Sequence, residues 1–163
     1  MMEILDLYND LGEKLKETII RGEKPDKGKN IMLSVIFIKN NEDKYLIQKT
    51  SKAKGNYFSS TGGHVTQGEN GLETIKRELE EELDIVNISD KIQHIKTFKY
   101  PTKPCIFNVY LLKVEQPDIS ELKLQKEEVE EVKLLTSKEI EDIINNGNFL
   151  ESHAYIFKNF INC

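Results

Sequence analysis

The sequence predicts an α/β protein in which helices pack on the faces of a mixed β-sheet. Short apolar runs rich in β-forming residues precede one early helical segment, further strands follow it, and two helical segments lie near the end of the chain. With 163 residues, the chain has the length of one globular domain and can bury a core without disulfides or a structural metal. We therefore expect a single domain over residues 1–163.

Composition excludes several classes of ligand and location. Charged residues make up 31% of the chain and hydrophobic ones 38%, and the net charge of -5 argues against a nucleic-acid polymer as partner, since such proteins concentrate basic residues on one face. No apolar run approaches the roughly 20 residues that cross a bilayer, and residues 1–8 lack the order of a signal peptide. Cys105 and Cys163 are not closely spaced. We expect a cytoplasmic protein with two free thiols and no membrane contact.

The first expected element is an N-terminal extension over residues 1–30. Apolar residues within 2–20 recur at a helical spacing, but the sequence NDLG at 9–12 has the composition of a tight turn between two strands. We favour a short hairpin, and a helix is the alternative. The polar, turn-rich segment 21–30 then serves as a connector to the main body.

Five strands are expected in the main body. Two strand–turn–strand units are indicated, one turning at the sequence KNNED and the other at PTKP, and a single strand follows them. These strands are expected at residues 31–38, 44–50, 91–100, 105–114 and 129–135. Helices are expected at 136–145 and 149–161, because the sequence TSKE resembles a helix start and Asn-Gly a helix stop.

Residues 62–85 (GGHVTQGENGLETIKRELEEELDI) predict a glycine-rich loop that leads into the early helix. Asn70 can cap the first turn, and Glu73 can reach back to complete a capping box. Apolar residues recur at spacings of three and four and form one stripe that faces the core. They are Leu72, Ile75, Leu79 and Leu83.

Three carboxylates of this helix are expected to converge. At about 100° per residue, Glu78, Glu81 and Glu82 fall within an arc of roughly 100° beside the apolar stripe. Like-charge pairs one turn apart cost about 0.2–0.5 kcal/mol each, and acids in the last turn also oppose the helix dipole. A hard cation such as Mg²⁺ or Mn²⁺ would offset this repulsion, whereas the scarcity of nearby His and Cys argues against zinc. A solvated acidic helix face is the alternative explanation.

The spacing of fixed positions in this segment resembles the Nudix box, G-x5-E-x7-R-E-U-x-E-E-x-G-U, where U is aliphatic. The matching residues are Gly63, Glu69, Arg77, Glu78, Leu79, Glu81, Glu82 and Ile85. The one departure is Asp84, which stands where the box has glycine. Because Asp tolerates the left-handed conformation that ends a helix, at a cost of about 1 kcal/mol, we expect strain there without loss of the site.

Similarity to the Nudix hydrolase superfamily implies an α/β/α sandwich and metal-dependent hydrolysis of a diphosphate linkage, in a nucleoside diphosphate derivative or a related organic pyrophosphate. By the family pattern, Glu78, Glu81 and Glu82 hold Mg²⁺ or Mn²⁺. Arg77 orients a glutamate by ion pairing, and Glu69 supports the loop–helix geometry. The catalytic base is a glutamate. Glu78 is one candidate for it, and Glu127 or Glu128, just before the last predicted strand, is another.

The loop residues Gly62, Gly63 and His64 are expected to bind substrate or to stabilise the loop, and for His64 we favour the structural role slightly. Together with Leu-Ile-Gln-Lys at 46–49, and with Asp-Leu-Tyr at 6–8 and Arg-Gly at 21–22, this loop resembles the branch of Nudix proteins related to isopentenyl-diphosphate isomerase. An isomerase requires a catalytic cysteine just before the Gly-His pair, but Thr61 and Gly62 precede it here. Hydrolysis is therefore preferred. An isomerase and a non-catalytic nucleotide-sensing module are the alternatives.

The resemblance leaves the substrate open. Aromatic side chains could stack on a base, although aromatics in strands lie more often in the core; they are Tyr57, Phe58, Phe98, Tyr100, Phe107 and Tyr110. The expected partner is a small-molecule diphosphate. A homodimer is compatible with the family resemblance.

Overall fold

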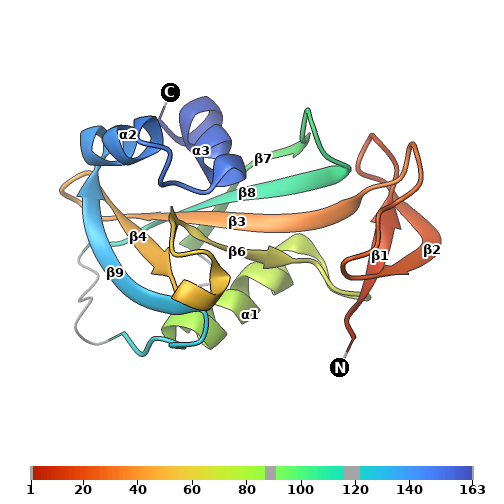
Figure 1. Cartoon of the computed structure of the whole chain (residues 1–163), viewed down its shortest axis with the longest axis horizontal. Coiled ribbons are helices and arrows are strands. Elements are labelled where there is room, and N and C mark those ends of the chain that lie inside the picture. Colours follow the sequence, from red (N-terminus) through yellow and green to blue (C-terminus); the bar gives the residue numbers. More distant parts are fainter. Residues whose placement is uncertain (1, 87–90, 116–121, 163) are drawn as a thin grey trace.

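The computed structural model describes residues 2–86, 91–115 and 122–162, and it places a mixed β-sheet between two helical layers (Figure 1). One face of the sheet is covered by α1 (Gly71–Leu83). The other face is covered by α2 (Ser137–Asn145) and α3 (Glu151–Ile156). This arrangement confirms the expected α/β/α sandwich.

Alternation along the central strand β3 (Ile31–Lys39) accounts for both helical layers. Val35 and Phe37 belong to the core cluster that packs against α2 and α3, whereas Ile36 and Ile38 belong to the cluster that packs against α1. Successive side chains of a strand point to opposite faces, so a strand that is apolar on both faces lies between two layers.

The neighbours of β3 run in both directions. β8 (Cys105–Lys113) is parallel to β3 in a register from Ile31↔Cys105 to Lys39↔Lys113, and β6 (Thr61–His64) is antiparallel to it. β7 (Ile92–Lys99) pairs antiparallel with β8, as the second strand–turn–strand unit predicts. The sheet is therefore mixed.

The first predicted unit forms both strands but hardly any pairing between them. β4 (Lys44–Thr50) shares only the register pair Lys39↔Tyr45 with β3. It then diverges and pairs antiparallel with β9 (Val129–Thr136) and with the short β5 (Phe58–Ser59). The place beside β3 that β4 leaves is taken by β6. These partners are distant in sequence, so the local pattern did not reveal them.

The N-terminal extension contains the favoured hairpin and no helix in its described part. β1 (Ile4–Tyr8) and β2 (Lys14–Ile20) pair antiparallel. The Asn9 side chain stabilises the turn, since its Oδ1 accepts hydrogen bonds from the backbone N–H groups of Leu11 (2.9 Å) and Glu13 (3.0 Å). The hairpin lies at one end of the sheet, at the right of Figure 1.

The C-terminal region differs from the prediction at one boundary. The helix expected at 149–161 begins at Glu151, because Phe149 pairs with Phe58 in an isolated bridge and the Leu150 N–H donates to the Phe58 carbonyl at 2.8 Å. After Ile156 the chain continues as one π-helical turn, Phe157–Ile161. The capping box of α2 is present as expected.

Two further expectations concern thiols and membrane spans. Cys105 is a half-buried free thiol, and Cys163 lies outside the described residues. Across 2–86, 91–115 and 122–162, no helix combines the length and the apolar character needed to cross a bilayer.

Candidate active site

Helix α1 positions the predicted carboxylates. Its N-terminus has the expected capping box, in which Asn70 Oδ1 accepts from the Glu73 N–H at 2.9 Å and Glu73 Oε1 accepts from the Asn70 N–H at 3.0 Å. Its apolar stripe is buried against the sheet at Ile75, Leu79 and Leu83. With one face anchored in the core, the rotation of the helix is set, and so is the direction of its polar face.

The C-terminus of α1 bears out the expected conformation of Asp84. Its backbone has φ 58° and ψ 36°, the left-handed region in which glycine is favoured. The Asp84 N–H bonds the Glu80 carbonyl at 3.0 Å, and the Ile85 N–H bonds the Leu79 carbonyl at 3.1 Å. The last carbonyls of the helix are thus satisfied, and the turn ends as the box requires despite the missing glycine.

Two of the three carboxylates lie largely inside the protein. Glu82 is 8% exposed and Glu78 is nearly as enclosed, whereas Glu81 is half exposed. Burial raises the pKa of the Glu78 carboxyl above its usual range. Burial and then the charge of Glu78 raise the pKa of Glu82 to about 8. Two buried acids one turn apart therefore resist carrying charge together, and a cation between them would remove that penalty.

Arg77 joins these acids to the loop before the helix. Its Nη1 donates to Glu78 Oε1 at 2.9 Å and lies 3.4 Å from Glu81 Oε2. Its Nε and Nη2 donate to the two oxygens of Glu69 at 2.8 and 3.0 Å, and Nη2 also donates to the His64 carbonyl at 3.3 Å. The guanidinium is held on both sides, which is the geometry expected of a residue that orients a glutamate.

Glu69 is bound tightly enough to shift its titration. Burial would raise the pKa of this carboxyl, but hydrogen bonds from Arg77, Thr74 and Thr66 outweigh burial and hold the pKa at about 2. Its Oε1 accepts from Thr66 Oγ1 at 2.9 Å and from Thr74 Oγ1 at 2.8 Å. Glu69 therefore fixes Arg77 and also ties the loop to the first turn of α1.

The predicted glycine loop is a strand as far as His64. Gly62 and Gly63 pair with Val35 and Ser34 of β3. A Cβ on Gly63 would lie 2.3 Å from Glu78 Oε1, so the Glu78 carboxyl occupies the space that a side chain would need. Burial, followed by the nearby charge of Arg21, lowers the pKa of His64 to about 4. His64 is therefore neutral near pH 7.

A chain of hydrogen bonds connects the sheet to Glu82. Gln48 Nε2 of β4 donates to Glu82 Oε2 at 3.1 Å, and Gln48 Oε1 accepts from Thr61 Oγ1 at 3.1 Å. All three side chains are buried. Gln48 had no predicted role, although strand alternation contains the signal: Gln48 lies two residues from Leu46 and so shares the face that packs on α1.

The carboxylates of α1 and Arg77 border a cavity of about 200 Å³. Glu78, Glu81 and Glu82 form one side of it, and Gly62, Gly63 and His64 of β6 form another. Of the two acids considered before β9, Glu128 lines the cavity, and its Oε1 lies 3.3 Å from Lys54 Nζ. Glu127 contributes instead a backbone carbonyl that accepts from Ser51 Oγ at 2.7 Å. The structure thus brings together every predicted site residue except Glu127.

Comparison with known proteins decides the family. A family model described as NUDIX domain matches residues 31–160. The chain belongs to the Nudix hydrolase family. It is 33% identical over 162 residues to an uncharacterized Nudix hydrolase of Listeria monocytogenes, lmo0368, a match that covers 97% of this chain and 92% of that protein. It is also 37% identical over 70 residues to the 8-oxo-dGTP diphosphatase of Haemophilus influenzae, covering 40% of this chain and 52% of that protein.

Solved structures share the fold of this Nudix hydrolase. DR0079 from Deinococcus radiodurans superposes with a TM-score of 0.73 at 24% identity, covering 90% of this chain and 91% of that one. A bifunctional NMN adenylyltransferase/ADP ribose pyrophosphatase from Francisella tularensis, complexed with AMP and a Mn ion, superposes with a TM-score of 0.66 at 22% identity, covering 84% and 41%. At these identities the likeness establishes the fold.

The donor set of the Nudix helix fits a hard divalent cation, since it offers only carboxylate oxygens. Within the described ranges, no three His, Cys, Asp or Glu side chains already converge as a complete ligand set. The geometry gives the reason, because Glu78 and Glu81 are turned toward Arg77 Nη1.

A second cavity, of about 240 Å³, adjoins the first and shares Gly63, His64 and Glu82 with it. Its wall includes Leu33, Tyr57, Phe107, Leu150 and His153. Two of the six aromatics considered for stacking therefore reach a cavity, and Phe107 is also part of the core. The others lie in or against the two core clusters: Phe58, Phe98, Tyr100 and Tyr110.

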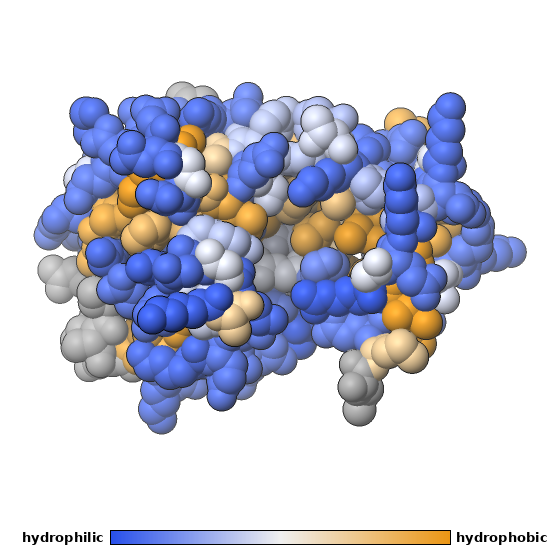
Figure 2. Space-filling model, in the orientation of Figure 1, coloured by the Kyte–Doolittle hydropathy of each residue, from blue (hydrophilic) through white to orange (hydrophobic). Residues whose placement is uncertain are grey.

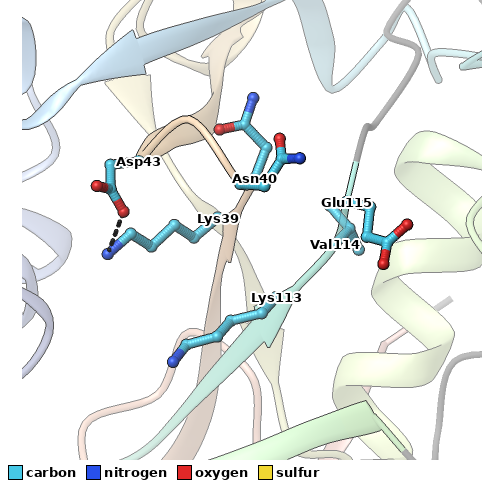
Figure 3. Close-up of a pocket in the computed structure, with 7 residues that line it drawn as sticks. Lys39, Asn40, Asp43, Lys113, Val114 and Glu115 are labelled. Carbon is cyan, nitrogen blue, oxygen red and sulfur yellow. Dashed lines mark ion pairs between the residues drawn. The ribbon is translucent and has the colours of Figure 1, made fainter.

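A further cavity of about 320 Å³ lies at the carboxyl ends of β3 and β8 (Figure 3). Lys39 and Lys113 extend into it side by side, and Lys39 Nζ is paired with Asp43 Oδ1 at 3.1 Å. It contains no residue of the Nudix box. The carboxylate site lies instead beside the middle of β3, where Ser34 and Val35 pair with Gly63 and Gly62 of β6.

Proposed function

We propose that this Nudix hydrolase cleaves a diphosphate linkage in a nucleoside diphosphate derivative or a related organic pyrophosphate, using Mg²⁺ or Mn²⁺ held by Glu78, Glu81 and Glu82. The observation that carries the proposal is the buried pair Glu78 and Glu82, which faces a cavity that also holds Arg21 and Lys54. Acids enclosed in this way are stabilised by cations, and cations together with basic side chains suit a diphosphate.

Each residue of the site then has a definite task. When bound, the ions would neutralise the diphosphate and lower the pKa of an attacking water. Arg77 fixes one oxygen of Glu78 by a hydrogen bond, and Glu69 keeps Arg77 in place. Gln48 orients one oxygen of Glu82 by donating to it. Gly63 leaves the space in which the Glu78 carboxyl lies.

Hydrolysis requires a group that accepts a proton from water. The water oxygen forms a bond to one phosphorus, the bridging P–O bond breaks, and the water proton passes to a carboxylate. Glu78 and Glu128 are the two candidates on the cavity wall. Glu78 bonds Arg77, whereas Glu128 pairs only loosely with Lys54 at 3.3 Å and is accessible to solvent. The base is the one whose conversion to Gln removes the acidic limb of the kcat against pH profile.

The nucleotide part of the proposal is supported by the Haemophilus relative, which is named a diphosphatase of 8-oxo-dGTP. An isomerase is less well supported, because Thr61 and Gly62 precede the Gly-His pair and Cys105 is not among the described residues that line either cavity of the site. A sensing module that binds without turnover has no need of buried acids at the cavity wall.

The test is product release from a panel of nucleoside diphosphate derivatives and isopentenyl diphosphate, with Mg²⁺ and Mn²⁺, by the wild type, Glu82→Gln and a matched Glu80→Gln. Glu80 is exposed on the same helix and does not line the cavity. We expect the activity of Glu82→Gln to fall by more than about a hundredfold. This loss is larger than the loss of activity expected when a residue that only supports a metal ligand is replaced. Glu80→Gln should act as the wild type does.

Stability measurements separate loss of metal binding from loss of the fold. Without metal, the free energy of unfolding of Glu82→Gln should equal that of the wild type or exceed it by about 0.2–0.5 kcal/mol, because one like-charge pair is removed. Mg²⁺ should raise the melting temperature of the wild type and leave that of Glu82→Gln nearly unchanged. Equal turnover by both proteins, or binding of every diphosphate without turnover by the wild type, would contradict the proposal.

A further inference from the structure

The N-terminal hairpin lies outside the matched Nudix domain at 31–160, yet it borders the carboxylate cavity. Arg21, directly after β2, and Glu3, directly before β1, line this cavity together with Glu78, Glu81 and Glu82. Arg21 also lines the adjoining cavity. The hairpin therefore adds one cation and one anion to a site whose other residues come from the Nudix domain.

The hairpin is fastened to the loop that leads into α1. The Gln67 N–H donates to the Ile4 carbonyl at 2.9 Å, and the Gly68 N–H donates to Asp6 Oδ2 at 2.9 Å. Asp6 is buried and also pairs with Lys14 at 3.3 Å. Figure 1 shows the loop that follows β6 extending to the hairpin. Because the hairpin and the loop are bonded directly, the position of Arg21 relative to the site is defined.

The charges around the cavity distinguish Arg21 from Arg77. Arg77 is fully engaged by Glu69, Glu78 and Glu81. Arg21 Nη1 pairs with Glu3 Oε2 at 2.9 Å, with side chains 49% and 42% exposed. An exposed ion pair of this kind contributes little to stability, so a more highly charged anion can displace Glu3. A guanidinium presents paired N–H groups that match two phosphate oxygens.

We propose that Arg21 is a substrate-binding residue that exchanges Glu3 for an anionic oxygen of the diphosphate. This inference rests on the proposed function and names the residue outside the Nudix box that recognises its substrate. Glu3 competes for the guanidinium in the free enzyme and leaves it when substrate binds. Figure 2 shows that the hairpin end of the molecule carries both hydrophilic and hydrophobic side chains, with hydrophilic ones prevailing over the rest of this face.

The test compares Arg21→Gln, Arg21→Lys and Glu3→Gln, with Lys16→Gln as a matched control. Lys16 is an exposed cation on β2 that lines neither cavity. Arg21→Gln should raise KM about tenfold or more with kcat within about threefold of wild type, the loss expected for one charged hydrogen bond. Arg21→Lys should restore part of the affinity. Glu3→Gln should leave KM unchanged or lower it, and Lys16→Gln should leave it unchanged.

A purely structural ion pair gives a different pattern. If Arg21 and Glu3 only held the hairpin, both Gln variants would raise KM alike and lower the melting temperature alike. That pattern, or an unchanged KM in Arg21→Gln, would overturn the proposal.

Binding of inorganic pyrophosphate with Mg²⁺, measured by calorimetry, keeps this test separate from that of the proposed function. Weaker binding by Arg21→Gln alone supports the role of Arg21 even when no diphosphate is hydrolysed, an outcome that would refute only the hydrolase activity. Equal binding by the wild type and Arg21→Gln, or no binding by the wild type, counts against Arg21.

Discussion

Gly63 shows, at the scale of a single residue, how the absence of a side chain positions a functional one. The Glu78 carboxyl lies where a Cβ on residue 63 would be, with Oε1 at 2.3 Å from that position. The obstacle is the end of a flexible side chain and no part of the backbone. The fold can therefore accommodate a larger residue at position 63 if the Glu78 side chain moves. That movement would take the Glu78 carboxyl away from its place in the site.

We predict that Gly63→Ala folds and loses activity. The displaced Glu78 should cost at least about tenfold in metal affinity, and kcat should fall with it. The melting temperature without metal should change by only a few degrees, because no backbone atom blocks the new methyl group. Metal titration by calorimetry and thermal unfolding check both statements. A wild-type metal affinity would show that Glu78 does not need this position.

Sequence reasoning found the residues of the box because they lie within 24 positions of one another, at spacings that a helix and its preceding loop fix. It assigned no role to Arg21, Gln48 or Lys54, which reach the same site from other elements. Their approach depends on long-range strand pairing, and a single sequence contains little information about such pairing.

At the scale of an element, helix α1 was predictable nearly in full. Its cap, its buried stripe and its left-handed end at Asp84 all follow from local rules of spacing and side-chain type. β6 was missed because two of its four residues are glycines, which have a low preference for strands. It forms a strand because β3 offers it a place that β4 vacates.

The end of α1 gives a prediction about stability. Asp84→Gly should raise the free energy of unfolding by about 0.5–1 kcal/mol, since glycine adopts φ 58° without the steric cost that Asp bears. It also removes a negative charge from the C-terminal end of the helix dipole. Denaturant unfolding measures this change. Asp84→Ala serves as the control and should be destabilised, because Ala has no polar group to favour the left-handed region.

At the scale of the whole molecule, His153 connects one helical layer to the sheet. Its Nδ1 accepts from the Ser60 N–H at 3.1 Å, which joins α3 to the turn between β5 and β6. Burial lowers the pKa of His153 to about 4, and the imidazole is neutral in the folded protein. The ordinary pKa of an exposed histidine, which applies to the unfolded chain, is about 6.5.

Acidification should therefore weaken the fold through His153. The unfolded chain binds a proton between pH 6.5 and pH 4 that the folded protein does not, so this contribution is fully present above pH 6.5 and is lost as pH falls toward 4. The loss by pH 4 is on the order of 3 kcal/mol. In His153→Gln, whose amide oxygen can still accept from Ser60, unfolding free energy should fall less between pH 7 and pH 4. An equal fall in both proteins would show that folding does not shift the pKa of His153.

The layers of the molecule followed from the sequence more readily than its connections. Residues 31–38 are largely apolar at both alternating sets of positions, which indicates a strand that is apolar on both faces. Such a strand implies a helical layer on each side of the sheet. The parallel pairing of β3 with β8 and the divergence of β4 from β3 directly after their turn depend on partners more than 60 positions away in the sequence. The N-terminal hairpin was favoured on its turn residues, which interact locally.

The divergence of β4 from β3 has a consequence for Gln48. An amide has one end that only donates and one end that only accepts, and Thr61 on β6 binds the accepting end. The donating end is thereby the one left for Glu82 on α1. An ionised Glu82 can only accept, so it requires the amide N–H of Gln48, and the Thr61 hydroxyl, which can donate or accept, donates to the amide oxygen that remains. Valine at position 61, similar in shape but unable to donate, would leave the buried oxygen of Gln48 without this hydrogen bond and so remove one of the two bonds that fix the amide.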